Sequence, residues 1–180
     1  MLAGLDTNVL IDVRVLRAEP ILARVLAGEG WTTAFVDQEF SDPLEETRRG
    51  VGRVFPFIEV DPVDSRLVPQ IERDQIAIMG QQKASVGSAA GEVSLIHVAR
   101  TIRPGSIVLS NDPHAVGLGK RRGILVRGTL YVMHRAFSAS LLTAEDAWAN
   151  YSALLDNGRR PPRLTRSQLN SYLITGTDPR

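Results

Sequence analysis

Short apolar runs alternate along the chain with longer segments in which apolar positions recur at helical spacing. Most of the short runs are rich in β-branched or aromatic residues and are bounded by polar, glycine or proline positions, which predicts strands. The predicted strands are Met1–Asp6, Trp31–Phe35, Phe55–Val60, Ser106–Ser110 and Ile124–Arg127. Helical spacing with capping and stop residues predicts helices at Val9–Ala18, Pro20–Ala27, Val36–Arg49, Asp64–Gln82, Glu92–Ile102, Leu130–Ala139, Ala144–Asp156 and Arg166–Leu173. The small residues of Ser85–Gly91 indicate a flexible connection.

Strands that alternate with helices are typical of βαβ units, in which neighbouring strands are parallel and helices cover both faces of the sheet. We therefore expect an α/β fold, a three-layer α/β/α sandwich with a central parallel sheet of four or five strands. A chain of 180 residues has room for one such domain and a small addition. We expect the sandwich to occupy residues 1–140 and a helical extension packed on it to occupy residues 141–180.

The composition narrows the class of protein. With 43% hydrophobic and 23% charged residues, the chain has the content of an ordinary globular domain. Cysteine is absent, which excludes a thiol nucleophile, a disulfide framework and a zinc–thiolate site. The longest stretch without charge, Ser167–Thr177, is too short and too polar for a membrane span, and the first residues do not resemble a secretory signal. We expect a cytoplasmic protein with no membrane segment.

The net charge of +1 hides an uneven distribution. Residues 1–119 carry 11 basic and 16 acidic side chains, whereas residues 120–180 carry 10 basic and 4 acidic ones. An acidic part joined to a basic part suits a metal site that faces a polyanion. An uneven scatter of surface charge is the alternative interpretation.

Four carboxylates are placed where a parallel sheet gathers its functional groups, at the carboxyl ends of the strands. Asp6 ends the first predicted strand, Asp112 follows the strand Ser106–Ser110, Glu39 lies one helical turn after the second strand, and Glu92 opens a helix. If they meet, each like-charged pair about 4 Å apart costs roughly 4 kcal/mol at an effective dielectric near 20. A divalent cation relieves this repulsion, and an oxygen-only ligand set favours Mg²⁺ or Mn²⁺. Such an ion lowers the pKa of bound water and supports phosphodiester hydrolysis.

Three of these carboxylates lie in the segments LDTNVLID (Leu5–Asp12), GEVSLIHVA (Gly91–Ala99) and VLSNDPHA (Val108–Ala115). In order and spacing, these segments resemble the signature segments of the PIN-domain family, the nuclease fold of VapC-type toxins. The run VRGTLYVMHRA (Val126–Ala136) is similar to a PIN subgroup in which a GTL turn leads into C-terminal helices. The resemblance implies that Asp6, Glu92 and Asp112 bind Mg²⁺ or Mn²⁺.

The resemblance assigns a second acid by spacing alone, to Glu39. Its acidic neighbours leave a solvated helix face as the alternative. They are Asp37, Asp42, Glu45 and Glu46. The catalytic set that we predict is therefore Asp6, Glu39, Glu92 and Asp112.

Other polar residues near these segments are candidates for positioning the substrate. The resemblance implies that Asn8 orients Asp6 or a bound phosphate. The basic residues Lys120, Arg121, Arg122 and Arg127 are placed to follow an RNA backbone, with a solvated helix end as the alternative. A second arginine cluster could bind RNA or an acidic partner. Its members are Arg159, Arg160, Arg163 and Arg166.

The chain departs from the family pattern at two positions. Asn111 stands where the subgroup often has another aspartate, and His114 stands where many members have an additional acid. Fewer carboxylates favour one firmly held metal over two. We interpret His114 as solvated and His97 and His134 as structural.

The carboxylates and the resemblance together predict a magnesium-dependent endoribonuclease, and the resemblance implies that it is the toxin of a type II toxin–antitoxin pair. The resemblance further implies a cognate antitoxin and a homodimer. The alternative is a PIN-like module that binds RNA or protein with little or no catalysis, which the departures at Asn111 and His114 motivate. A phosphatase of the aspartyl-phosphate type is disfavoured, because it needs an acid two residues after Asp6 and Asn8 occupies that place.

Overall fold

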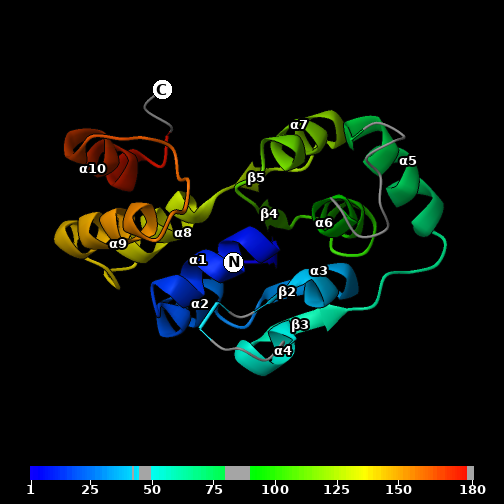
Figure 1. Cartoon of the computed structure of the whole chain (residues 1–180), viewed down its shortest axis with the longest axis horizontal. Coiled ribbons are helices and arrows are strands. Elements are labelled where there is room, and N and C mark those ends of the chain that lie inside the picture. The colour runs from blue at the N-terminus through cyan, green and yellow to red at the C-terminus, as the bar shows by residue number, and fades with distance from the viewer. Residues whose placement is uncertain (42, 45–49, 80–89, 178–180) are drawn as a thin grey trace.

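The computed structural model describes residues 1–41, 43–44, 50–79 and 90–177. Its centre is a five-stranded parallel sheet with the strand order β3-β2-β1-β4-β5 (Figure 1). The strands are β1 (Ala3–Leu5), β2 (Gly30–Thr33), β3 (Ile58–Asp61), β4 (Ile107–Leu109) and β5 (Val126–Arg127). The predicted α/β fold with a parallel sheet between helices is confirmed.

Helices cover both faces of this sheet. Those of the sandwich are α1 (Thr7–Val15), α2 (Glu19–Leu26), α3 (Ala34–Glu39), α4 (Val51–Val54), α5 (Val68–Met79), α6 (Ala90–Thr101), α7 (Pro113–Arg122) and α8 (Thr129–Ser138). Helices α1, α2 and α8 lie on one side of the sheet, and α5, α6 and α7 lie on the other (Figure 1). The short helix α3 follows β2 and contacts both α1 and α6.

Two further helices, α9 (Ala144–Asp156) and α10 (Arg166–Thr175), contact each other and α8. Both begin with a capping box, in which Thr143 and Thr165 supply the N-cap hydroxyls. They enclose a second apolar cluster, which also contains Val25 of α2. The division into residues 1–140 and 141–180 stays a prediction.

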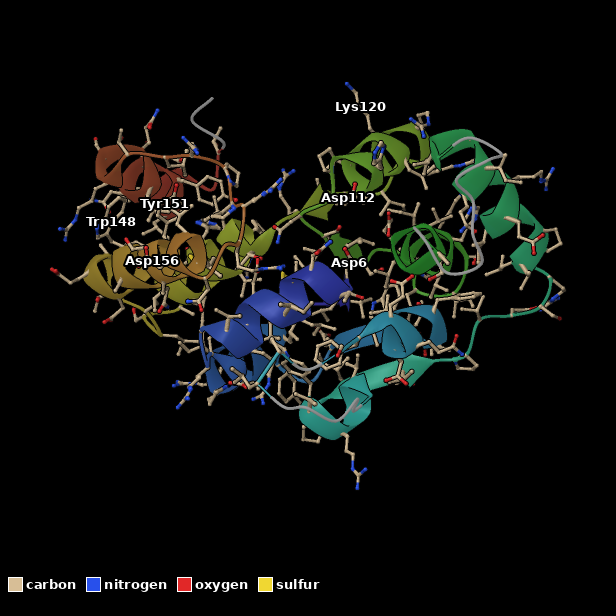
Figure 2. All side chains as sticks on the ribbon, in the orientation of Figure 1. Asp6, Asp112, Lys120, Trp148, Tyr151 and Asp156 are labelled. Carbon is tan, nitrogen blue, oxygen red and sulfur yellow. The ribbon has the colours of Figure 1, made fainter. Side chains whose placement is uncertain are left out.

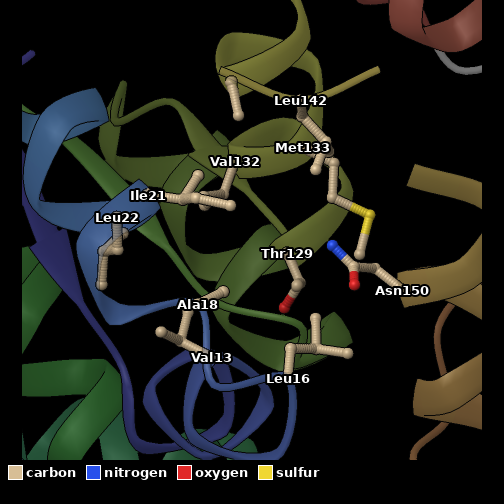
Figure 3. A pocket seen from close by; sticks show the side chains of 11 residues that line it. Val13, Leu16, Ala18, Ile21, Leu22, Thr129, Val132, Met133, Leu142 and Asn150 are labelled. Atoms are coloured by element: carbon tan, nitrogen blue, oxygen red, sulfur yellow. The ribbon is translucent and has the colours of Figure 1, made fainter. Parts of the chain in front are cut away.

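A small cavity of about 20 Å³ lies between α1, α2 and α8, near α9. Its lining is apolar except for Thr129 and Asn150 (Figure 3). This volume is close to the room that one water molecule needs. Within the described chain, no helix has both the length and the apolar character that a membrane span requires.

Several predicted element bounds were wrong. The strand predicted at Trp31–Phe35 ends at Thr33, because Ala34 and Phe35 already belong to α3. The strand predicted from Phe55 begins at Ile58, and the helix predicted from Asp64 begins at Val68. The helix predicted at Val36–Arg49 ends at Glu39, because Phe40 adopts an extended backbone; residues 42 and 45–49 lie outside the described part. Residues 80–82 of the predicted helix Asp64–Gln82 also lie outside it, as does most of Ser85–Gly91.

The sequence pattern did not predict bounds for α7 or α4. Gly117 and Gly119 weaken the helical pattern of α7, and α4 has only four residues. A Cβ atom at Gly119 would lie 2.4 Å from a methyl carbon of Val126, so this glycine lets α7 pack closely against β5. Packing against β5 therefore favours the helix α7, although its local sequence has a low helix propensity.

Candidate functional site

The carboxyl ends of β1 and β4 bring Asp6 beside Ser110. The backbone amide of Asp6 donates to the Leu109 carbonyl at 3.0 Å, which continues the ladder between the two strands by one residue. The Asp6 carboxylate then caps α1, because Oδ1 accepts from the Thr7 amide at 2.8 Å. Its Oδ2 accepts from the Ser110 hydroxyl at 2.7 Å. With 2% of its surface exposed, Asp6 is held rigidly at the edge of the sheet.

Ser110 also connects this position to Asp112. Its hydroxyl accepts from the Asp112 amide at 3.1 Å while it donates to Asp6. The Asp112 carboxylate caps α7 by accepting from the His114 amide at 2.6 Å. Figure 2 shows Asp6 and Asp112 close together near the centre of the molecule, where β1 and β4 end. Two helix N-termini thus present carboxylates at one place on the sheet edge.

Glu39 and Glu92 reach this edge from α3 and from the first turn of α6. The Gly91 amide donates to Glu39 Oε1 at 3.1 Å, so the end of α3 is tied to the start of α6. A Cβ atom at position 91 would lie 2.4 Å from Glu39 Oε2, so a larger residue there would displace the end of the Glu39 side chain. Among the neighbouring acids, Asp37 accepts from the Val51 amide and holds the start of α4 instead. Asp42, Glu45 and Glu46 lie outside the described residues.

The four carboxylates influence one another electrostatically. Burial raises the pKa of Glu92 to about 7, and the negative charges of Asp6, Asp112 and Glu39 contribute to this rise. The pKa of Asp6 is raised by burial, with a contribution from Asp112, although the hydrogen bonds from Ser110 and Thr7 oppose the shift. Burial also raises the pKa of Glu39, with a contribution from the charge of Asp6. The structure therefore places the four acids that the sequence singled out close enough for the charges of Asp6, Asp112 and Glu39 to act on Glu92.

The donor chemistry of this site fits a hard divalent cation, but the arrangement of the side chains is not a coordination shell. Carboxylate oxygens with raised pKa values favour either protonation or a nearby positive charge. Among the described residues, no three acidic or histidine side chains are placed to hold one ion together. In this conformation, three of the carboxylates instead accept hydrogen bonds from backbone amides at the helix starts; they are Asp6, Glu39 and Asp112.

Of the basic residues that the sequence proposed for substrate positioning, Arg127 lies nearest to the acids along the sheet edge. The Ser110 amide donates to its carbonyl at 2.8 Å, and its guanidinium lies 6.0 Å from the centre of the Tyr131 ring. Lys120 lies about 12 Å farther along α7 than Asp112, at about 1.5 Å per residue, and Figure 2 shows it at the far end of that helix. Arg121 also lies in the last turn of α7, at the end of the helix away from the acids.

Arg122 forms an ion pair with Asp74 at 2.8 Å, and Asp74 also contacts the ring of His97 at 3.0 Å. This contact holds α5, α6 and α7 together, which makes Arg122 part of the packing between them. His134 contacts the Leu173 carbonyl at 2.9 Å and links α8 to α10. His114 is exposed.

Asn8 lies beside Asp6, with its side-chain nitrogen 3.5 Å from Asp6 Oδ2. Its carbonyl accepts from the Arg159 guanidinium at 3.1 Å. The side chain is thus placed to orient Asp6, although at this distance the hydrogen bond is weak.

Sequence reasoning missed a buried group behind the acidic site, centred on Asp12. The Asp12 carboxylate is 2% exposed and accepts from Asn111 at 2.8 Å and from the Thr129 hydroxyl at 2.6 Å. Arg159 of the segment after α9 completes the group with an ion pair to the other carboxylate oxygen. The departure at Asn111 now has a physical reason, since an aspartate there would face the carboxylate of Asp12. The only local signal was a charged residue at an apolar position of α1.

A cleft of about 620 Å³ opens beside the acids, between the sheet edge and the C-terminal segment. Ser110 and Asn111 lie on one side of it, and Pro162 and Tyr172 lie on the other. Arg127 and Arg160 also line it. The volume is in the usual range for ligand sites in proteins.

Comparisons with known proteins add nothing to this description. A scan against protein-family models, a search of curated proteins and a search of solved structures each found no match to this chain. The assignment of a function therefore depends on the chemistry of the site itself.

Proposed function

We propose that this chain is a cytoplasmic, magnesium-dependent endoribonuclease that hydrolyses phosphodiester bonds of RNA. The observation that carries the proposal is the meeting of carboxylates from separate segments at one edge of the sheet. Ser110 contacts both Asp6 and Asp112, and the Gly91 amide ties Glu39 to the start of α6, which carries Glu92. Such a cluster is costly in a metal-free fold and useful in an enzyme that acts on a polyanion. The family resemblance supports the further proposal of a toxin that forms a homodimer and is neutralised by a cognate antitoxin.

In this proposal Asp6, Glu92 and Asp112 hold the metal, and Mg²⁺ or Mn²⁺ supplies an activated water and positive charge for the transition state. Ser110 keeps the Asp6 carboxylate in one orientation through its 2.7 Å hydrogen bond. Glu39, which accepts from the Gly91 amide and is less buried than Asp6, would accept a proton from an attacking water. Attack by water leaves the 2′-hydroxyl uninvolved, so the products should carry 5′-phosphate and 3′-hydroxyl ends.

The test is cleavage of a structured RNA with Mg²⁺, with EDTA, and by Asp6→Asn protein. Asparagine is also a good N-cap residue, so α1 should remain folded in this variant. Asp156→Asn is the matched control, since Asp156 is an exposed carboxylate of α9 far from Asp6 in the view of Figure 2. We expect cleavage by the wild type and the control only. Undiminished cleavage by Asp6→Asn protein would refute the proposal.

One observation favours a second candidate, an RNA-binding module with little catalysis. In the described chain no coordination shell is formed, and Asn111 contributes to packing around Asp12. Such a module would bind RNA equally well with Mg²⁺ and with EDTA and would leave it intact. A magnesium titration that monitors both binding and cleavage separates the two functions.

A further inference from the structure

The cleft beside the acidic site has a lining that suits an anion. Of its described lining residues, two are arginines and none is an aspartate or a glutamate. Arg127 and Arg160 are both exposed, and neither forms an ion pair with the residues that the structure describes. A phosphate diester can neutralise the positive charge of two guanidinium groups that have no acidic partner.

The position of the cleft is continuous with the acids. Ser110, which lines the cleft, is the residue that contacts both Asp6 and Asp112. Pro113, the residue after Asp112, also lines it. A polymer that places one phosphate at the acids therefore has its adjoining nucleotide at the cleft.

The walls of the cleft are held in place before any ligand arrives. The Tyr151 hydroxyl donates to the Pro162 carbonyl at 3.0 Å and accepts from the Leu164 amide at 2.8 Å, so it fixes both ends of a short extended segment. Arg159 ties the start of this segment to the buried Asp12. Arg160 lies between these fixed points in the chain, and its side chain lines the cleft.

The sheet side of the cleft is equally fixed. Asn111 donates to Asp12 at 2.8 Å and to Thr129 at 2.9 Å, and it accepts from the Thr129 amide at 2.9 Å. A Cβ atom at Gly128 would lie 2.5 Å from Asn111 Oδ1, so the turn before α8 approaches this side chain closely. Apolar side chains complete the lining. They are Val116, Val126, Leu130 and Leu164.

We propose that this cleft is a nucleotide subsite of the RNA substrate, in which Arg127 and Arg160 bind a phosphate next to the scissile one and the apolar lining contacts the attached nucleoside. As a substrate subsite it rests on the proposed nuclease function. The subsite is built by the C-terminal segment together with β5 and the start of α7, so it requires the extension that follows α8. Arg163, which the sequence grouped with Arg160, is exposed and does not line the cleft.

The experiment compares wild-type protein, Arg127→Ala with Arg160→Ala, and Arg163→Ala. Cleavage of a fluorescein-labelled single-stranded RNA gives KM and kcat, and fluorescence anisotropy in EDTA gives Kd without cleavage. We expect the double variant to raise KM and Kd about tenfold or more, because two charged hydrogen-bond donors are removed. The slope of log Kd against log salt should become shallower by about 0.7 for each phosphate that the protein no longer binds. Arg163→Ala should follow the wild type.

The outcomes separate this inference from the nuclease proposal. If the wild type cleaves RNA but the double variant keeps its KM and its salt dependence, the subsite is wrong and the nuclease stands. An equal loss in Arg163→Ala would assign binding to a diffuse basic surface and would also overturn the subsite. If the wild type does not cleave, the nuclease proposal fails. The Kd values in EDTA still decide whether the cleft binds RNA. Unchanged RNA affinity with weakened binding of a polyglutamate peptide would assign the cleft to a protein partner and overturn the inference.

Discussion

Replacing Glu92 by glutamine should stabilise the metal-free protein at alkaline pH but not at acidic pH. Glu92 is 9% exposed, and burial followed by the charge of Asp6 raises its pKa from 4.5 to about 7. The folded state therefore favours the protonated acid. The stabilisation that this proton provides is complete below about pH 4.5 and is lost as the pH rises through 7.

The size of the effect follows from the same values. A pKa raised from 4.5 to about 7 corresponds to about 3 kcal/mol of unfolding free energy, at about 1.4 kcal/mol for each pH unit. Most of this is lost by the wild type between pH 5 and pH 8, roughly 2 to 3 kcal/mol. Glutamine is neutral and close in shape to the protonated acid, so the Glu92→Gln protein should not lose this unfolding free energy as the pH rises.

Urea unfolding in EDTA at pH 5 and at pH 8 measures this difference through the midpoint and the m-value. Glu72→Gln on α5 is the matched control, because Glu72 is an exposed glutamate and its removal should change neither curve. The reasoning would be refuted by parallel pH dependence of wild type and Glu92→Gln, since Glu92 would then not be held among like charges.

Four further outcomes follow from the same contacts. Added Mg²⁺ should raise the urea midpoint of the wild type at pH 8 more than NaCl of equal ionic strength does; equal effects would argue against a metal site. Gly91→Ala should lower kcat for RNA cleavage about tenfold or more with little loss of stability, because the new methyl group displaces the end of the Glu39 side chain. An unchanged kcat would show that Glu39 is not a catalytic residue. Arg159→Ala should destabilise the fold by about 2 to 3 kcal/mol in urea unfolding, since it leaves the Asp12 carboxylate buried without its cation. The double variant Arg159→Ala with Asp12→Asn should recover part of that loss. Asn111→Asp should cost about 2 kcal/mol at pH 7 and less at pH 4, because it sets two carboxylates against each other, and an equal cost at both pH values would contradict this account.

The order of elements and the place of two acids were available from local pattern alone. Apolar runs that are too short for helices alternate with helical spacing, and this alternation is enough to predict parallel strands between helices. Once the strands are parallel, residues that follow β1 and β4 must lie at one edge. Asp6 and Asp112 are such residues, and the structure places them on either side of Ser110.

The choice among similar side chains needed the tertiary structure. Glu39 and Asp37 are two residues apart and chemically alike, yet one contacts Gly91 and the other contacts Val51. The same holds for the basic residues, because Arg122 pairs with Asp74 while Arg127 lies at the cleft. The sequence shows where a charged side chain stands in the chain, but it does not show which distant residue that side chain contacts.

By itself, then, the sequence determined that this is a parallel α/β sandwich with carboxylates at the ends of its strands, because secondary structure and strand direction follow from local periodicity. Only the tertiary structure decided the group around Asp12, the tie between Arg159 and α1, and the cleft that the C-terminal segment forms with β5. These features join residues up to 151 positions apart, and their energies come from burial and from partners that no local pattern contains.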